Sequence, residues 1–280
     1  MILSASDLQK YVPLQTSSFN FDKYAGFETR ALYKHFPRFL GDGLVDSLAG
    51  ENPDEALAAK VVPALANLVV LEATPFFDVV LTSTGFGVVK NNNIAPASKE
   101  RVKAFASACL GAANDFMDIL LAFLEGNAAG YASWNKSSLN EDSLIPDTTV
   151  FNAQSRLNLK RHQFVEIKQN LAALENTLFA QALSPEFLAE LQAGSDTLVK
   201  PMFQKALVFL AYDEFLSMDG QENTGGFKSR GTMFMARGMS LLVDSIASYP
   251  TFATYGYEAP YDNDNEDNLD SGFFIAGCTA

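Results

Sequence analysis

The sequence predicts an all-α protein: a helical bundle with short β or turn elements and extended arms at both ends. Three observations predict this class. Apolar residues recur at intervals of three and four along several stretches, which is the spacing of one helix face. Capping residues and prolines divide these stretches from one another. The 280 residues are 48% hydrophobic and include 23 Phe, so the chain is able to bury a sizeable core.

Residues 1–25 show little periodicity and are predicted to form an N-terminal arm. A first helical unit, residues 26–126, then opens with a helix from about Glu28 to Leu48. Pro37 should kink or split that helix, because proline lacks the backbone N–H that continues it. The apolar positions expected in the core are Leu32, Phe36, Phe39, Leu40, Leu44 and Leu48.

The rest of the first unit contains two further predicted helices and a short extended element. The first helix starts at Asp54 and is expected to reach about Leu81. Residues 84–90 combine Gly with β-branched and aromatic residues, which is typical of a short strand or turn. The second helix opens at Ser98 and runs to about Glu125. The expected kinks or breaks in the first are Pro63 and Pro75.

The second half begins with residues 127–156, a polar stretch that is long for a loop and predicts a linker or insertion. A second helical unit, residues 157–250, contains helices predicted to begin near Leu157, Ser184, Asp196 and Thr232. Residues 251–280 form an acidic C-terminal arm with no Lys or Arg. Its apolar stretch is expected to occupy a groove or sheet edge on a partner. The residues expected to make that contact are Phe273, Phe274 and Ile275.

The two helical units resemble each other weakly. Three pairs of segments align: Leu68–Leu71 with Leu207–Leu210, Leu44–Gly50 with Leu188–Gly194, and Gly85-Phe86 with Gly226-Phe227. An internal repeat that produces two similar three-helix units would explain this likeness. Helical sequences also resemble one another by chance, so both interpretations stay open.

The sequence contains no recognisable catalytic, metal-binding or cofactor-binding motif, so we predict a protein that is not an enzyme and holds no cofactor. Its two histidines, His35 and His162, are lone helix residues expected at a surface or edge. The stretch 262–267 resembles a calcium loop, but Asp267 stands where that loop requires Gly. The least favoured alternative is an enzyme with a diffuse carboxylate site formed by Glu72, Asp78, Asp115 and Asp118.

The net charge of −13 argues against static binding of nucleic-acid phosphates and against an anionic membrane surface. The same charge would let DNA slide past without sticking. Cys109 is expected to be a core thiol. The sequence shows neither a secretory signal nor a run of about 18 apolar residues, so no membrane span is expected.

Two small basic clusters stand out against this acidic background. They are Lys99, Arg101 and Lys103 in the first unit and Lys228, Arg230 and Arg237 in the second. Each cluster lies at the start of a predicted helix. The simplest interpretation is a solvated face, and the sharper one is a contact with acidic residues of a neighbouring subunit, such as those of the C-terminal arm.

Several segments resemble a family of mostly helical virion proteins from tailed phages and prophages of the Bacteroidetes, including the crAss-like phages. The most telling is Asn93–Val102, which precedes a long helix and a connection with Tyr131 and Trp134. The arm Met1–Ser4, the segment Phe39–Gly41 and the turn Gly85–Gly87 contribute to the likeness. The similarity covers most of residues 1–250 and is one of pattern, with no catalytic motif.

The resemblance implies a head-to-tail connector, or adaptor, ring below the phage portal. Such proteins form cyclic homo-oligomers, here of about 12 copies, whose contacts close around the ring. The implied partners are the portal, the tail or ring proteins, and double-stranded DNA that passes through. The implied location is the virion, after synthesis in the host cytoplasm, with no membrane. The alternative is a helical protein-binding scaffold module of a bacterium or prophage.

Overall fold

The computed structural model of the chain describes residues 2–12, 22–76, 79–82, 85–88, 98–218 and 226–253. It confirms the all-α class, since the only sheet among these residues is a two-stranded hairpin. The chain divides into two compact units, Met1–Ser138 and Leu139–Ala280. Each unit buries apolar residues of its own.

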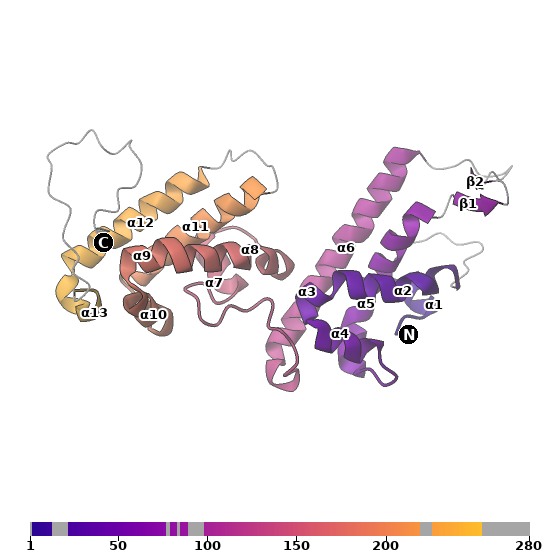
Figure 1. The fold of residues 1–280 in the computed structure, drawn as a ribbon, viewed down its shortest axis with the longest axis horizontal. Coiled ribbons are helices and arrows are strands. Elements are labelled where there is room, and N and C mark those ends of the chain that lie inside the picture. The colour runs from indigo at the N-terminus through magenta and orange to yellow at the C-terminus, as the bar shows by residue number, and fades with distance from the viewer. Residues whose placement is uncertain are drawn as a thin grey trace. The chain divides into compact units, whose positions relative to one another are not determined.

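The first unit is built around α5, which packs against α6, α2 and α1 (Figure 1). The core residues expected between positions 28 and 48 are all buried. The elements of this unit are α1 (Ala5–Tyr11), α2 (Asp22–His35), α3 (Pro37–Leu40), α4 (Asp42–Ala49), α5 (Glu55–Ala73), η1 (Thr74–Phe76), β1 (Val79–Thr82), β2 (Gly85–Val88), α6 (Lys99–Gly126) and η2 (Ala128–Gly130).

Residues 22–49 form three helices where the sequence predicted one helix that kinks or splits. Pro37 stands at the first position of α3, where its missing N–H costs nothing. Gly41 separates α3 from α4 with a φ of +79°, a conformation that only glycine adopts readily. The break predicted at Pro37 is therefore confirmed.

The helix that starts after Asp54 ends earlier than predicted. The Asp54 carboxylate caps α5 by accepting the backbone N–H of Leu57 at 2.7 Å. Pro63 is accommodated inside α5, which ends at Ala73 instead of Leu81. Pro75 is unable to donate the hydrogen bond that would continue the helix. Residues 79–82, which are rich in Val, form β1 instead.

The extended element predicted at residues 84–90 is confirmed as β2. It pairs antiparallel with β1, with Val80 opposite Gly87 and Leu81 opposite Phe86. This hairpin connects η1 to the segment before α6. Ser98 caps α6 as expected, because its hydroxyl accepts the N–H of Arg101 at 3.4 Å, and the helix ends at Gly126.

The described part of the predicted N-terminal arm is packed against the unit. Ser4 and Asp7 form a capping box that starts α1. Leu8 and Val12 are fully buried, and α1 packs on α5. Residues 22–27, just before the predicted helix start at Glu28, also belong to α2, which begins at Asp22. The prediction of an arm is therefore wrong for residues 2–12, because their apolar side chains are buried in the core of the unit.

The second unit is built around α11, which packs against α12, α8 and α7 (Figure 1). Its core is rich in aromatic rings, among them the edge-on pair Phe179 and Phe203 at 6.4 Å. Its elements are α7 (Thr148–Ser155), α8 (Arg161–Leu174), the π-helix η3 (Glu175–Phe179), α9 (Ala180–Leu183), α10 (Pro185–Ala193), α11 (Lys200–Met218), α12 (Phe227–Asp244), η4 (Ile246–Ser248) and α13 (Pro250–Ala253).

The segment predicted as a linker, residues 127–156, is packed on both sides of the unit boundary. Trp134 is buried in the first unit and donates its indole N–H to the Phe39 carbonyl at 2.9 Å. Leu144 and Ile145 are fully buried in the second unit. The sequence missed α7, although Asp147 provides a capping signal by accepting the N–H of Val150.

The end of the second unit also differs from the prediction. α12 begins at Phe227, five residues before Thr232, because Gly226 serves as its N-cap with a φ of +61°. The unit continues past residue 250 into α13, where Phe252 is fully buried. The acidic arm predicted at 251–280 therefore begins no earlier than residue 254, and residues 254–280 lie outside the described part of the chain.

Parts of the suspected repeat recur in the element order. α4 and α10 each end at a Gly C-cap, Gly50 and Gly194. Each is followed by an aspartate near the start of the central helix. Asp54 caps α5, and Asp196 accepts the N–H groups of Val199 and Lys200 where α11 begins. The Gly-Phe pairs are not equivalent, because Gly85 lies in a strand and Gly226 caps a helix.

Candidate functional site

The first predicted interface cluster occupies the opening turns of α6. Lys99, Arg101 and Lys103 are all exposed, and none makes an ion pair with another described residue. Cations at a helix N-terminus oppose the helix dipole. Helix stability therefore does not explain this cluster, which leaves it available to bind a partner.

The two sides of α6 carry different parts of this cluster. Successive residues turn by about 100° around a helix, so Lys99 and Lys103 share a side with Leu110. Arg101 lies on the opposite side, together with Ile119. Leu110 and Ile119 are 43% and 53% exposed. α6 thus presents cations beside apolar side chains on two separate sides.

The second predicted cluster lies on α12. Arg230 and Arg237 are seven positions apart on one side of the helix, and both are exposed. The Arg230 guanidinium lies 5.9 Å from the centre of the Phe209 ring, and the Lys205 ammonium lies 5.4 Å from the centre of the Phe234 ring. Arg230 of α12 and Lys205 of α11 are therefore already placed over aromatic rings of the same unit.

The aromatic rings beneath these cations form a stack. Phe209 stacks on Phe227 at 6.2 Å and on Phe234 at 5.8 Å, with interplanar angles of 18° and 10°. Tyr212 meets Phe227 edge-on at 5.0 Å. Because these rings pack against one another, α12 has fewer apolar contacts left to be made by a partner than α6.

The apolar character of α6 exceeds what its own unit buries. Among the described helices, Glu55–Phe76 and Lys99–Gly126 pass a length and composition test for a membrane span. The apolar window of the first is 72% buried, as expected for a core helix, and that of the second is 33% buried. One or two such helices are weak grounds for a membrane protein. Within the described part of the first unit, the apolar window of α6 is thus less covered than that of α5.

The remaining predicted interface residues, Phe273, Phe274 and Ile275, lie outside the described residues. The same holds for Asp78 and for the acidic stretch 262–267. Among the described residues, no group of three or more His, Cys, Asp or Glu side chains is arranged to hold a metal ion.

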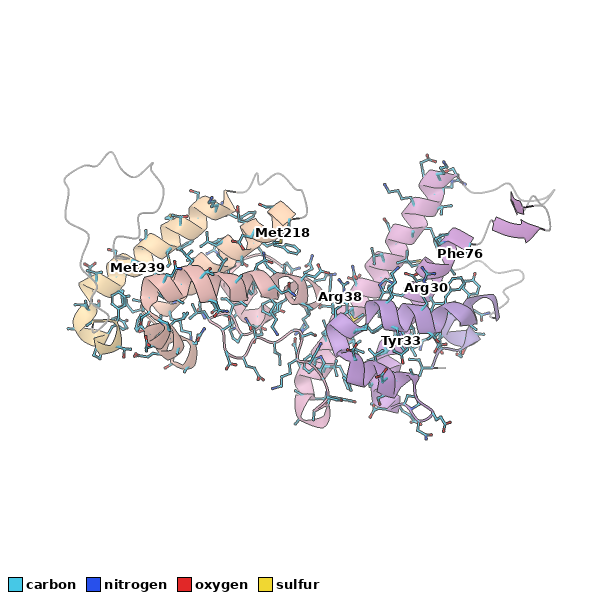
Figure 2. The ribbon with its side chains drawn as sticks, viewed as in Figure 1. Arg30, Tyr33, Arg38, Phe76, Met218 and Met239 are labelled. Carbon is cyan, nitrogen blue, oxygen red and sulfur yellow. The ribbon has the colours of Figure 1, made fainter. Side chains whose placement is uncertain are left out.

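Glu72 is one of the carboxylates named in the alternative enzyme hypothesis. It forms ion pairs with basic side chains of α2. Its side chain, 6% exposed, pairs with Arg30 at 2.8 Å, Lys34 at 2.6 Å and His35 at 2.9 Å. Figure 2 labels Arg30 on α2. Burial raises the pKa of Glu72, but hydrogen bonds from Lys34 and His35 outweigh it and leave the pKa below its usual value. A carboxylate held ionised between three partners is a structural ion pair, unsuited to take up a proton.

Glu175 lies at the start of the π-helix, and its pKa is shifted in the opposite direction to that of Glu72. It is buried and accepts hydrogen bonds from the Ser143 hydroxyl and the Leu144 N–H, each at 2.7 Å. Burial raises its pKa, and these hydrogen bonds only partly oppose that effect. Since both donors come from the segment before α7, the carboxylate anchors that segment to the unit.

One of the two histidines differs from the predicted surface or edge position. His35, 19% exposed, lies at an edge and joins the Glu72 cluster, whereas His162 is buried on α8. Both positions follow from packing between helices, which their basic neighbours in the sequence do not reveal. Cys109 is buried as predicted, and burial raises the pKa of its thiol.

A hollow of about 500 Å³ in the first unit is lined by Asp54 and residues 126–131. Its lining is mainly glycine, alanine and backbone, and Tyr131 donates its hydroxyl to Asp54 at 3.2 Å. This lining offers one carboxylate, already hydrogen-bonded, and so gives little basis for catalysis.

The comparison with protein families gives one finding. Residues 31–143 match a family of unknown function, DUF6712. The matched range runs from the second half of α2 through α6 and slightly past Ser138, so it corresponds to most of the first unit. No curated protein and no solved structure matches the chain.

Sequence reasoning found the basic clusters but missed the exposed apolar residues of α6. The residues that face α5 recur at regular spacing, from Cys109 and Ala113 to Met117. Leu110 keeps that spacing, three positions before Ala113, so the pattern gave no sign of its exposure. Ile119 falls outside that spacing, and this departure was the available signal. The extent of their exposure depends on where α5 ends, which the sequence did not predict.

Proposed function

We propose that this chain is a structural virion protein that forms a homo-oligomeric connector ring between a phage portal and the tail. The observation that carries the proposal is the pair of exposed basic faces on α6 and α12. Neither is neutralised by an ion pair with another described residue, in a chain of net charge −13. Opposite charge on a second copy is the simplest complement.

A ring requires each subunit to offer two different surfaces, because its contacts are heterologous. The basic faces supply one surface, and the excess of acidic residues supplies the other. The same acidic excess would disfavour tight binding of DNA phosphates in a central passage. DNA would then pass during packaging and ejection without being held.

The test is the assembly state of the full-length protein, measured by native mass spectrometry and negative-stain electron microscopy. We expect closed rings of many copies that bind a portal ring coaxially. The variant Lys99→Glu/Arg101→Glu/Arg230→Glu/Arg237→Glu should lose the rings and keep its helical circular dichroism. A monomer at every concentration, with no affinity for portal or tail proteins, would refute the connector proposal.

The second candidate is a helical scaffold that binds an unrelated protein. The exposed apolar residues of α6, with Ile119 at 53%, favour it, since such residues mark protein contacts. In that case the chain would stay a monomer or dimer and form a stoichiometric complex with one partner. The mass measurement separates the two candidates directly.

A further inference from the structure

The N-terminal half of α6 is exposed on nearly every side. Of residues 99–111, Cys109 is the one that is buried. The side of α6 that faces the core further along continues here as a stripe with spacing of three and four. We call it the N-terminal stripe of α6, and its residues are Lys99, Val102, Lys103, Ala106 and Leu110.

This stripe changes character along the helix. Its opening turns carry the two ammonium groups of Lys99 and Lys103, with Val102, 39% exposed, between them. Leu110, 43% exposed, follows further along. From Lys103 onward the order is therefore positive charge first and apolar surface second. Leaving apolar side chains exposed next to unpaired cations is unfavourable in a lone subunit and is typical of a docking surface.

The acidic segment of the same sequence has the complementary order. Residues 258–270 carry the six acidic side chains of the segment without any Lys or Arg, and Phe273, Phe274 and Ile275 follow. Negative charge therefore comes first and apolar residues second.

The spacings also agree. On α6, about 10 Å separates Lys103 from Leu110 at the helical rise per residue. In an extended chain, about 10 Å separates Asp270 from Phe273. A segment running parallel to α6 would thus bring Asp270 to Lys103 and Phe273 to Leu110.

We propose that the N-terminal stripe of α6 binds the acidic segment, residues 254–280, of a second copy of this chain. The proposal rests on the proposed ring, in which a second copy is always adjacent. The contact joins two different surfaces, as a ring requires. The basic face of α12 is the weaker candidate, because its Arg230 already lies over the Phe209 ring.

The test is photo-cross-linking in the full-length chain, with Phe274 replaced by p-benzoyl-phenylalanine. Chains of natural isotope content are mixed with ¹⁵N-labelled chains before illumination, so that mass spectrometry separates cross-links within a copy from those between copies. We expect mixed-isotope cross-links from position 274 to residues 102–110. Lys99→Glu/Lys103→Glu should lower their yield roughly tenfold.

The matched controls are Lys60→Glu on α5 and Arg156→Glu at the end of α7, two exposed basic residues outside both basic clusters. Both should leave the yield unchanged. Cross-links to α12, cross-links within one copy, or none at all in a particle that still forms rings would overturn the inference and leave the connector proposal standing. Failure to form any oligomer would overturn both.

Discussion

Glu72 illustrates how one buried charge ties two helices together. It lies on α5, and its three partners, Arg30, Lys34 and His35, all come from α2. The partners are spaced so that they occupy adjoining turns of one helix. Because Arg30 and Lys34 remain half-exposed, solvent screens part of their attraction, and the hydrogen bonds to the buried carboxylate carry most of the effect.

We expect Glu72→Gln to lower the free energy of unfolding by about 1–3 kcal/mol at neutral pH, because it removes charge-assisted hydrogen bonds to a buried group. The pKa of Glu72 is lowered in the folded state, so its contribution is present above the ordinary value of 4.5 and is lost as the pH falls through the folded pKa. The measurement is urea unfolding at a series of pH values.

The control for Glu72 is Asp46→Asn. Asp46 is an exposed carboxylate of the same unit that accepts the Tyr33 hydroxyl at 3.0 Å. This change should alter stability by less than about 0.5 kcal/mol. The ion pairs of Glu72 contribute little to stability if Glu72→Gln changes the free energy of unfolding no more than the control does at neutral pH, or if its effect grows in acid.

The sequence could not have revealed the ion pairs around Glu72. Arg30, Lys34 and His35 are visibly on one helix, but Glu72 is about forty positions away. Their meeting depends on the rotation of α2 against α5, which is set by side-chain packing. The same residues therefore appeared as a candidate catalytic carboxylate and a lone surface histidine. Cys109 could be placed correctly, because its burial follows from the apolar spacing of α6 alone.

The close packing of α12 on α11 depends on two glycines. A Cβ at Gly231 would lie 2.6 Å from Leu210 Cγ, and one at Gly238 would lie 2.8 Å from Phe203 Cε1. Both positions face side chains of α11, of which Leu210 is partly buried and Phe203 fully buried. Each is therefore a point where the helices approach more closely than an alanine would permit.

We expect Gly231→Ala and Gly238→Ala each to destabilise the second unit by about 1–3 kcal/mol, because the inserted methyl group overpacks the contact. The matched control is Gly111→Ala on α6, where a Cβ meets nothing within 4 Å. It should stabilise its helix by about 0.5–1 kcal/mol. Thermal unfolding followed by circular dichroism distinguishes these signs, and a stabilising Gly238→Ala would contradict the packing.

Glu175 makes a different kind of link, between a helix and an irregular segment. We expect Glu175→Ala to cost about 1–3 kcal/mol, because it leaves the buried Leu144 N–H without its acceptor. Glu175→Gln keeps an acceptor and removes a buried charge, so it should be at least as stable as the natural protein at neutral pH.

The pH dependence of Glu175 has the opposite sign to that of Glu72. Its folded pKa is raised, so ionisation becomes costly in the folded state as the pH rises above the ordinary value of 4.5. The advantage of Glu175→Gln should therefore grow with rising pH and vanish in acid. Chemical unfolding of both variants at several pH values checks this, and an advantage confined to acid would refute it.

Elements with strong periodicity were predictable, and those held by tertiary contacts were not. The start of α5 at Asp54, the start of α6 at Ser98 and the break at Gly41 all follow from capping and glycine signals. Segment 139–147 has no such period, and its position depends on Glu175 far along the chain. The early end of α5 depends on Pro75 and on the competing strand β1, two signals whose balance the sequence leaves undecided.

The whole chain consists of two units, each with a complete set of core contacts. The boundary at residues 138 and 139 falls inside the predicted linker. Trp134 on one side and Leu144 on the other are both buried in their own units. Composition marked the region as polar, but it could not show that every part of it packs on one unit or the other.

We expect the two halves, residues 1–138 and 139–280, to fold when produced separately. Units of this size bury about two thirds of the surface of their unfolded chains, which suffices for independent stability. Each half should show helical circular dichroism and a cooperative thermal transition. The first half should also associate less than the full chain, because it keeps the basic stripe of α6 and lacks the acidic segment proposed to bind it. An unfolded first half would show instead that α6, with its apolar window 33% buried, needs the rest of the chain to fold at all.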